Sequence, residues 1–431
     1  MKKTFLVPVM GLAATGLVGA QGLYNIMPYD DEPAESLPIH WTVNANIGWD
    51  DNPAPFGSDV AGFDSDESLY VSASVQGNFV SATPQTTWDV WGRVGVTYYI
   101  DEVTQTSVLG VSTADDDTFY QAAAGVNFVH RVSERLRLRS RNNVSYEQEP
   151  DYDQGIATDR RDGSYTRYSS DNSVGYRWTE RLGTVTGYRV HGTVYDEVDN
   201  QDYISHIFYN QFRYRVSPAT VLTASYRYGI VDNDSAPDSD SHYLLVGAEH
   251  QFSSQTVGVV RVGGQYYSPD NGDSSWSPYI EATLKTQVNE QFGLRGFLYY
   301  GIEDRGRNLW THDAAAILPM GMGVPTLVAY DERHTLRIGT QASYQVSPTL
   351  TLFGGLNYIN DQYEEGTFAQ GGVGSSPDFD ESTFNINLGA SLQVAENIYV
   401  TGTYNYTTAD SDSDLREYDR NRFQLGVQAS F

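Results

Sequence analysis

A two-residue alternation of apolar and polar side chains runs through this chain, and it is already clear in IHWTVNANIGW at residues 39–49. Side chains two positions apart on a β-strand point to the same face of the sheet. The same alternation recurs at residues 67–79 and 382–394, and again in RFQLGVQASF at residues 422–431. The pattern therefore predicts strands with one apolar and one polar face from residue 39 to the end of the chain.

The connections between these stretches are of two kinds. One kind is short and similar in wording, as in VSERL at 132–136, WTERL at 178–182 and VSPTL at 346–350, whereas the other is long and acidic, as in DNDSAPDSDS. Counting strands between them predicts about eighteen, each of roughly 10 to 14 residues, which is longer than most strands of soluble sheets. Short turns at one end and long loops at the other favour an all-β, transmembrane, antiparallel outer-membrane β-barrel over a soluble sandwich or propeller.

The N-terminus predicts export from the cytoplasm. MKKTFLVPVMGLAATGLVGA has two lysines, an apolar run and then small residues, which is the layout of a cleavable signal peptide. The alternative, a buried N-terminal helix, accounts less well for both the charged start and the small-residue end. We therefore expect a signal peptide at residues 1–20, a periplasmic N-terminal lead-in at 21–38, and a transmembrane β-barrel at 39–431 in the cell outer membrane.

Several of these features resemble a known family. The C-terminal Phe431 on an alternating strand looks like the signal by which the barrel-assembly machinery recognises bacterial outer-membrane proteins. GWDDNPAPF at 48–56, the long Tyr-rich strands and the VS-x-x-L turns are similar to the β-barrel porin 2 family. The resemblance implies contact with outer-membrane lipid and lipopolysaccharide. Relatives of this kind include barrels implicated in exopolysaccharide export. The resemblance implies no catalytic residue.

Composition excludes several functions. The formal net charge of −28 argues against a nucleic-acid partner, and the absence of Cys excludes thiolate chemistry. Asp410, Asp412 and Asp414 begin like a calcium loop, but Leu415 and Asn421 stand where such a loop needs Gly and Glu. No nucleophile elbow or H-E-x-x-H motif is present. We therefore expect no enzyme activity, no cofactor and no dedicated metal site; divalent-ion binding by the acidic loops stays open.

Most arginines of the strands fall on the polar phase and are therefore predicted to line the lumen. Arg137, Arg139 and Arg141 form a ladder along one strand, two residues apart. Two interpretations remain open: a track for anions or sugar acids, or arginines paired with Tyr and carboxylates to hold the lumen rigid. The predicted lumen residues are Arg93, Arg137, Arg139, Arg141, Arg167, Arg177, Arg189, Arg213, Arg227, Arg261, Arg295 and Arg337.

One long connection differs from the others because it is apolar. Residues 304–332 include WTHDAAAILPMGMGVPTLVAYDE, and a long loop without structure of its own is usually functional. We expect it to fold into the barrel as a constriction, with Asp304, Asp313, Asp331 and Glu332 facing the arginines. The alternative is an outward flap that packs on neighbouring loops or on a partner.

These features favour a porin-like channel for passive passage of small hydrophilic solutes, with a preference for anions. One alternative is a conduit for exopolysaccharide export that works with periplasmic polysaccharide-export proteins. Another is a structural or adhesive surface barrel with a blocked pore. All three functions share one architecture, so the sequence does not choose among them, and it leaves the oligomeric state open.

Overall fold

The computed structural model describes most of the chain after residue 35. The described residues are 36–53, 67–106, 112–147, 164–196, 202–234, 237–270, 272–303, 308–313, 324–368, 375–376, 378–412 and 416–431. The predicted signal peptide and most of the predicted lead-in lie outside these ranges. The first strand begins at Leu37, two residues before the predicted start of the barrel.

Strands make up the architecture of the described residues. Their bounds are β1 Leu37–Asp50, β2 Ser68–Ala82, β3 Thr86–Thr106, β4 Ser112–Arg131, β5 Leu136–Glu147, β6 Tyr165–Arg177, β7 Leu182–Tyr195, β8 Tyr203–Ser217, β9 Thr220–Asn233, β10 Ser239–Ser253, β11 Thr256–Pro269, β12 Ser275–Gln287, β13 Phe292–Ile302, β14 Asn308–Asp313, β15 Val324–Ser347, β16 Leu350–Phe368, β17 Ser375–Ser376, β18 Phe379–Ala395, β19 Ile398–Ser411 and β20 Tyr418–Ser430. No helix of these residues is long and apolar enough to cross a membrane.

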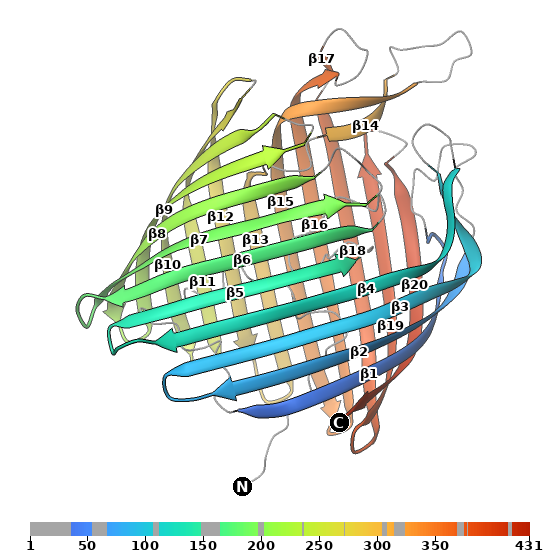
Figure 1. Ribbon diagram of the computed structural model, residues 1–431, viewed down its shortest axis with the longest axis horizontal. Helices are drawn as coiled ribbons and strands as arrows, with labels where there is room; N and C mark the ends of the chain where they lie inside the picture. The colour runs from blue at the N-terminus through green and yellow to red at the C-terminus, as the bar shows by residue number, and fades with distance from the viewer. Residues whose placement is uncertain are drawn as a thin grey trace.

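The strands close into one antiparallel barrel (Figure 1). Apart from β14 and β17, each strand pairs with the next one along the chain, so that β13 pairs with β15, β16 pairs with β18, and β20 returns to β1. Trp41 N donates to Phe431 O at 3.1 Å and Phe431 N donates to Trp41 O at 2.8 Å, so the last residue helps close the wall. Because β14 and β17 only extend the ends of β15 and β16, eighteen strands form the wall, which confirms the predicted architecture.

The tight turns share one kind of side-chain to backbone hydrogen bond. Ser133, Thr179 and Asn289 each accept a hydrogen bond on the side-chain oxygen from the backbone N–H three residues later, at 3.0, 3.0 and 2.8 Å. Short polar side chains stabilise a turn in this way because they replace a missing backbone partner. This explains why similar Ser/Thr/Asn turns recur at one end of the barrel, the end that faces the periplasm in barrels of this kind.

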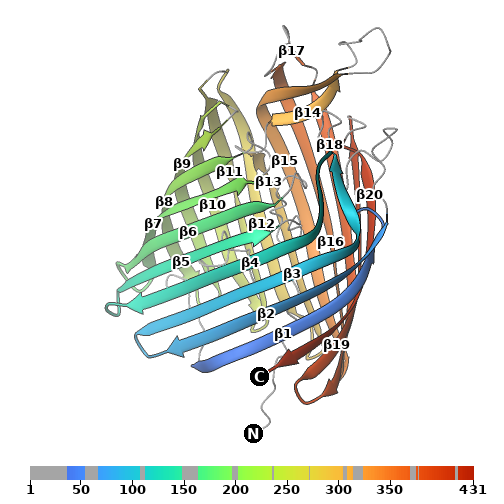
Figure 2. The same cartoon turned by 45° about the vertical axis from the view of Figure 1, so that its right-hand side comes forward.

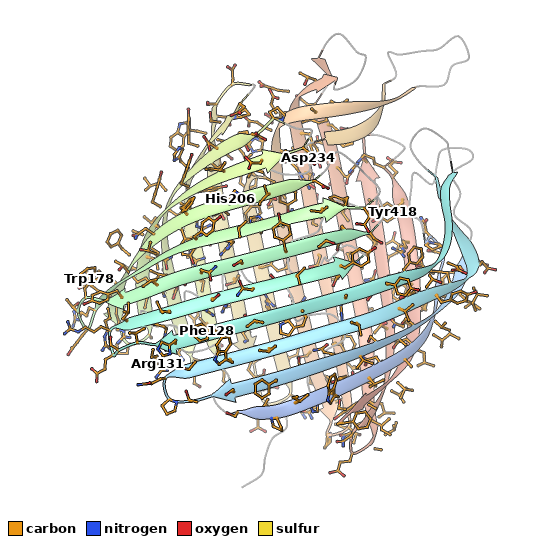
Figure 3. All side chains as sticks on the ribbon, in the orientation of Figure 1. Phe128, Arg131, Trp178, His206, Asp234 and Tyr418 are labelled. Atoms are coloured by element: carbon orange, nitrogen blue, oxygen red, sulfur yellow. The ribbon has the colours of Figure 1, made fainter. Side chains whose placement is uncertain are left out.

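The two faces of the wall are inverted relative to a soluble protein. Large apolar side chains face outward, with Leu244 69% and Leu425 58% exposed, whereas Arg213 and Arg261 are among the most deeply buried side chains. In Figure 3, Trp178 lies near the tight-turn end and Asp234 near the long-loop end, with the wall between them. An exposed apolar belt around a polar interior is the arrangement that a lipid environment requires.

Aromatic rings cover glycines on the inward face. A Cβ added to Gly389 would lie 2.3 Å from the Phe353 ring, and one added to Gly187 would lie 2.3 Å from the Tyr209 ring. Both pairs are direct cross-strand partners. Glycine therefore lets these rings lie flat against the neighbouring strand and keeps them out of the lumen.

The prediction of one unstructured loop over residues 304–332 was wrong. Residues 308–313 form β14 and pair with residues 324–329 of β15, so the segment contains a hairpin built on the barrel wall. In Figures 1 and 2, β14 and the start of β15 bend away from the line of the wall at the long-loop end. Asp331 and Glu332 are consequently strand residues. Glu332 pairs with Glu364 of β16, and Asp331 lies between two paired residues, Tyr330 and Glu332, which an analysis of loop composition does not detect.

Candidate functional site

The predicted lumen arginines all lie on strands. They alternate with the exposed apolar residues along each strand, so they point to the opposite face of the wall. On β8, for example, Arg213 is 0% exposed while its neighbours Phe212 and Tyr214 are exposed on the outer face. The strand registers carry this phase across the sheet, as in Asp171 opposite Arg189 and Lys285 opposite Arg295. The structure therefore places these arginines toward the interior. Whether they line an open path for solutes stays a prediction.

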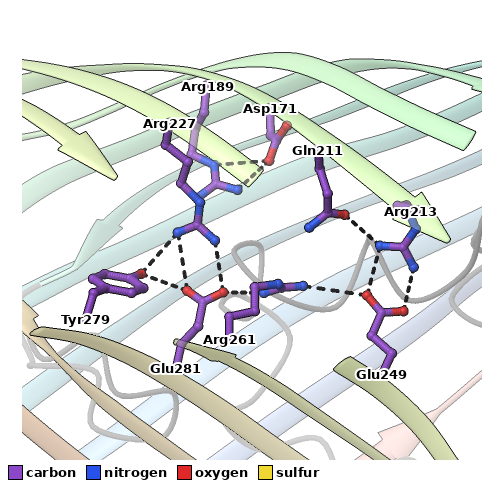
Figure 4. Close-up of polar contacts among 9 residues, drawn as sticks. All are labelled: Asp171, Arg189, Gln211, Arg213, Arg227, Glu249, Arg261, Tyr279 and Glu281. Carbon is purple, nitrogen blue, oxygen red and sulfur yellow. Dashed lines mark hydrogen bonds and ion pairs between the residues drawn. The ribbon is translucent and has the colours of Figure 1, made fainter. Parts of the chain in front are cut away.

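A network of arginines and acids crosses the inward face from β6 to β12 (Figure 4). At one end, Arg189 Nη2 donates to Asp171 Oδ2 at 2.7 Å, and the Tyr209 hydroxyl donates to Asp171 Oδ1 at 2.7 Å. Asp171 is therefore held by two strands, β7 and β8, as well as by its own strand. Such charge-assisted bonds are stronger than neutral ones, and they lock the side chains they join.

The centre of the network is Glu281 on β12. Arg227 Nη2 donates to Glu281 Oε1 at 3.0 Å, the Tyr279 hydroxyl donates to Glu281 Oε2 at 2.7 Å, and Arg261 also donates to this carboxylate. Arg227 additionally donates to the Tyr279 hydroxyl at 3.1 Å. Residues from β9, β11 and β12 thus meet at a single carboxylate, which ties three strands together on the inward face.

The most deeply buried pair of the network is Arg213 with Glu249. Arg213 Nη1 donates to Glu249 Oε1 at 2.8 Å and to Gln211 Oε1 at 2.7 Å, and Arg213 Nη2 lies 2.5 Å from Glu249 Oε2. Arg261, which is 1% exposed, lies 3.8 Å from Glu249 and links this pair to Glu281. The paired, rigidifying interpretation of the lumen arginines therefore describes Arg213 and Arg261.

Charge is unevenly distributed around the interior. The inward face of β5 to β8 carries two carboxylates, Glu147 and Asp171, against eight arginines. In the ladder, Arg137 is 4% exposed, whereas Arg139 and Arg141 are only partly buried and leave part of their surface accessible. The eight arginines of the inward face of β5 to β8 are Arg137, Arg139, Arg141, Arg167, Arg177, Arg189, Arg213 and Arg215.

Two further predicted lumen arginines have carboxylate partners elsewhere in the barrel. Arg93 Nη2 lies 2.9 Å from Glu147 Oε1, and Arg337 Nη1 lies 3.6 Å from Glu303 Oε1. Arg295 lies on β13 opposite Lys285 and Gln341. The interior is therefore not uniformly positive, because several carboxylates partly balance it.

Sequence reasoning missed some of these carboxylates. Asp50 is fully buried and binds Arg420 through two hydrogen bonds of 3.0 and 2.6 Å, and it also accepts from the Tyr99 hydroxyl at 3.1 Å. Asp361 accepts from Arg333 at 2.7 Å. Asp50 continues the polar phase of the first strand, so the alternation itself could have found it. Asp361 lies at the start of an acidic, Gly-rich stretch that reads as a loop, whereas β16 continues through it to Phe368.

Of the four residues of the predicted constriction, the structure describes the side chains of two. Asp304 and the side chain of Asp313 lie outside the described residues, while Asp331 and Glu332 lie on β15. Glu332 Oε2 lies 3.2 Å from His334 Nε2, and this hydrogen bond raises the pKa of His334 above its usual value. This contact is with a histidine of the same strand, and a constriction at Glu332 stays a prediction.

The same rim position holds a set of possible metal ligands. Within the described part of the chain, one ligand atom from each of Glu332, His334 and Glu364 lies within 4.8 Å of the others. Glu332 and Glu364 are direct cross-strand partners on β15 and β16. Imidazole with carboxylates is a donor set that suits divalent transition metals. This grouping could not be found in the sequence, because only the register between β15 and β16 brings Glu364 next to Glu332.

Residues 243–431 match the family described as outer membrane protein beta-barrel domain. No curated protein matches this chain. Among solved structures, Acinetobacter baumannii OccAB4 is 10% identical with a TM-score of 0.45, over 93% of this chain and 100% of that one. Pseudomonas aeruginosa OccK2 in complex with glucuronate is 12% identical with a TM-score of 0.45, over 91% and 98%. The closed barrel, its apolar outer belt and the family match over residues 243–431 together identify this chain as a β-barrel protein of the outer membrane.

Proposed function

We propose that the barrel is a channel for small hydrophilic solutes and that it favours anions. The observation that carries this proposal is the inward face of β5 to β8, where eight arginines stand against two carboxylates. A barrel of eighteen strands is too wide for side chains to fill, so its interior holds water. Fixed positive charge along one side of that water raises the local concentration of anions.

The paired network supports the same function in a different way. Carboxylates such as Asp171 and Glu249 hold arginines of the wall in place through hydrogen bonds. Guanidinium groups have five N–H donors, and planar donors held in place recognise carboxylates well. The substrate class that best suits this wall is therefore small organic acids, including sugar acids, with the partly exposed Arg139 and Arg141 as the accessible contacts.

The test is the ion preference of the purified barrel in planar lipid bilayers under a salt gradient. The double variant Arg139→Gln, Arg141→Gln removes two inward charges from β5. The matched control Arg135→Gln, Arg181→Gln removes two exposed charges from the tight turns. We expect the wild-type reversal potential to indicate anion preference, the inward variant to shift toward cations, and the control to stay close to wild type. The shift should weaken at high salt, where the Debye length falls to about 3 Å.

Two results would contradict the proposal. A barrel that inserts but shows no conductance at any voltage would refute a channel and would favour the structural or adhesive alternative. Equal ion preference in wild type and in the inward variant at low salt would show that Arg139 and Arg141 do not face the conducting path. Permeation of long acidic polysaccharides, tested in liposomes, would favour the export conduit over passage of small solutes.

A further inference from the structure

Four polar side chains form a closed ring of hydrogen bonds on the outward face of the barrel. Ser140 Oγ donates to Asn172 Oδ1 at 2.6 Å, and Asn172 Nδ2 donates to Ser170 Oγ at 2.8 Å. Ser170 Oγ then donates to Asn142 Oδ1 at 2.7 Å, and Asn142 Nδ2 donates back to Ser140 Oγ at 2.9 Å. Each member gives one hydrogen bond and receives one, across the β5–β6 pair. We call these four residues the polar ring.

The polar ring lies between two outward tyrosines of β6, on the face that should meet lipid. On β6, the outward side chains on either side of the ring are Val174 and then Tyr176 toward the tight turns, and Tyr168 toward the long loops. Asn142 and Asn172 are exposed. Aromatic residues mark the two membrane interfaces of such barrels, so the ring falls between the interfaces, in the hydrocarbon region.

Apolar and aromatic residues flank the ring on both neighbouring strands, so the ring is a polar patch within an otherwise lipid-compatible surface. On β7 the ring residues Asn172 and Ser170 pair with Tyr188 and Val190. A second outward polar pair lies one step further along, where Asn210 on β8 donates to Thr186 Oγ1 on β7 at 2.6 Å. On the other side, the outward residues of β4 that pair with the ring are Phe128, opposite Ser140, and Val126, opposite Asn142, and the small residues Ala124 and Ala122 follow further along β4. Figure 3 shows this wall toward the viewer, with Phe128 and His206 at its two sides. On the opposite wall, Leu356 on β16 and Leu388 on β18 are exposed apolar residues.

We infer that the outward face of β5 to β8 is the contact surface for a second copy of this chain. Acyl chains offer no hydrogen bonds, whereas small and amide side chains favour close protein–protein packing within a membrane. After closing the ring, each Asn amide keeps one N–H and one carbonyl lone pair for a partner. The face thus offers donors and acceptors in equal number, so it is complementary to itself.

The membrane restricts which partner can match the ring. Two barrels inserted in the same direction can be related only by an axis along the membrane normal, so each residue meets a partner residue at its own depth. A partner must then offer polar groups in the middle of the hydrocarbon region, where most proteins have none. A second copy presents the same ring at the same depth, and a twofold axis brings ring against ring.

Cysteine cross-linking in native outer membranes tests this contact directly, because the chain has no Cys of its own. Val144→Cys and Val174→Cys place a thiol beside the ring on β5 and β6, and Leu388→Cys is the control on the opposite wall. A short bismaleimide should give a cross-linked dimer from both ring-side variants at several times the yield of the control. Equal yields at all three positions, or monomer alone, would overturn the inference, as would an adduct with a different protein.

A second variant tests the ring itself. Ser140→Ala, Asn142→Leu, Ser170→Ala and Asn172→Leu, added to Val144→Cys, replace the polar ring with apolar side chains that suit lipid. The barrel should still fold, as shown by its heat-modifiable mobility on gels, while the dimer yield falls to that of the control. A folded variant that keeps the full dimer yield would show that the ring does not form the contact.

Discussion

The buried Arg213–Glu249 pair allows a sharp test of what holds the barrel wall together. Replacing Glu249 with Gln keeps the size of the side chain but removes the carboxylate charge. Arg213, which is 0% exposed, then keeps its charge next to a neutral amide, with Gln211 as its remaining neutral partner. Arg261, 3.8 Å from the same carboxylate, loses an ion pair as well. The substitution therefore leaves buried positive charge without compensation.

The expected cost follows from this burial. Breaking a buried ion pair by removing one partner destabilises a protein by about 3–5 kcal/mol, because the remaining charge is buried and unpaired. Glu147→Gln is the matched control, since Glu147 is also an inward acid paired with an arginine, Arg93, but both side chains retain some exposure. An ion pair that solvent can screen contributes about 1 kcal/mol or less. We therefore expect Glu249→Gln to cost several times more than the control.

The measurement is the free energy of unfolding in urea, followed by Trp fluorescence of the barrel refolded into lipid vesicles. The seven Trp residues provide the signal. A further variant, Arg213→Met with Glu249→Gln, removes the orphaned charge and should recover part of the lost stability. If Glu249→Gln and Glu147→Gln cost the same, or if the added Arg213→Met recovers nothing, the charge network does not stabilise the wall and the reasoning is refuted.

Three further outcomes are expected. Gly389→Ala should lower the free energy of unfolding by about 1–3 kcal/mol because the new Cβ meets the Phe353 ring, whereas Gly402→Ala, with no atom within 4 Å, should change it little; equal effects would contradict the packing. Phe431→Ser should reduce the heat-modifiable barrel recovered from outer membranes, and Phe431→Tyr should not; unchanged recovery would argue against an assembly signal at this residue. His334→Gln should destabilise the barrel most near pH 6 and less as pH rises through the raised pKa of His334, since the charged form binds the neighbouring carboxylate; a difference in melting temperature that does not depend on pH would refute this.

The architecture could be derived from the sequence because period-two alternation depends only on local geometry. Which face of a strand a residue occupies follows from its parity, so the eighteen-strand wall and the inward phase of the lumen arginines were predictable. The tight turns were predictable for a similar reason. Their Ser, Thr or Asn accepts a bond from an N–H three residues away, as Ser133 does from Leu136 at 3.0 Å.

The pairing partners were not predictable in the same way. Asp50 and Arg420 are 370 residues apart, and they meet only because β20 closes on β1. The prediction of a free loop over residues 304–332 failed for a related reason. β14 and β15 are stabilised by backbone hydrogen bonds, which a composition rich in Gly, Pro and Met does not reveal.

The sequence by itself determined the strands, their two faces and the residues on each, because these follow from the geometry of neighbouring residues along the chain. Only the tertiary structure decided which arginine meets which carboxylate and that four outward polar residues form a ring. Register between strands sets both. Ser140 faces Asn172 and Asn142 faces Ser170 because β5 and β6 pair in one register, and a slip of β6 by one residue would turn Ser170 and Asn172 to the other face and open the ring.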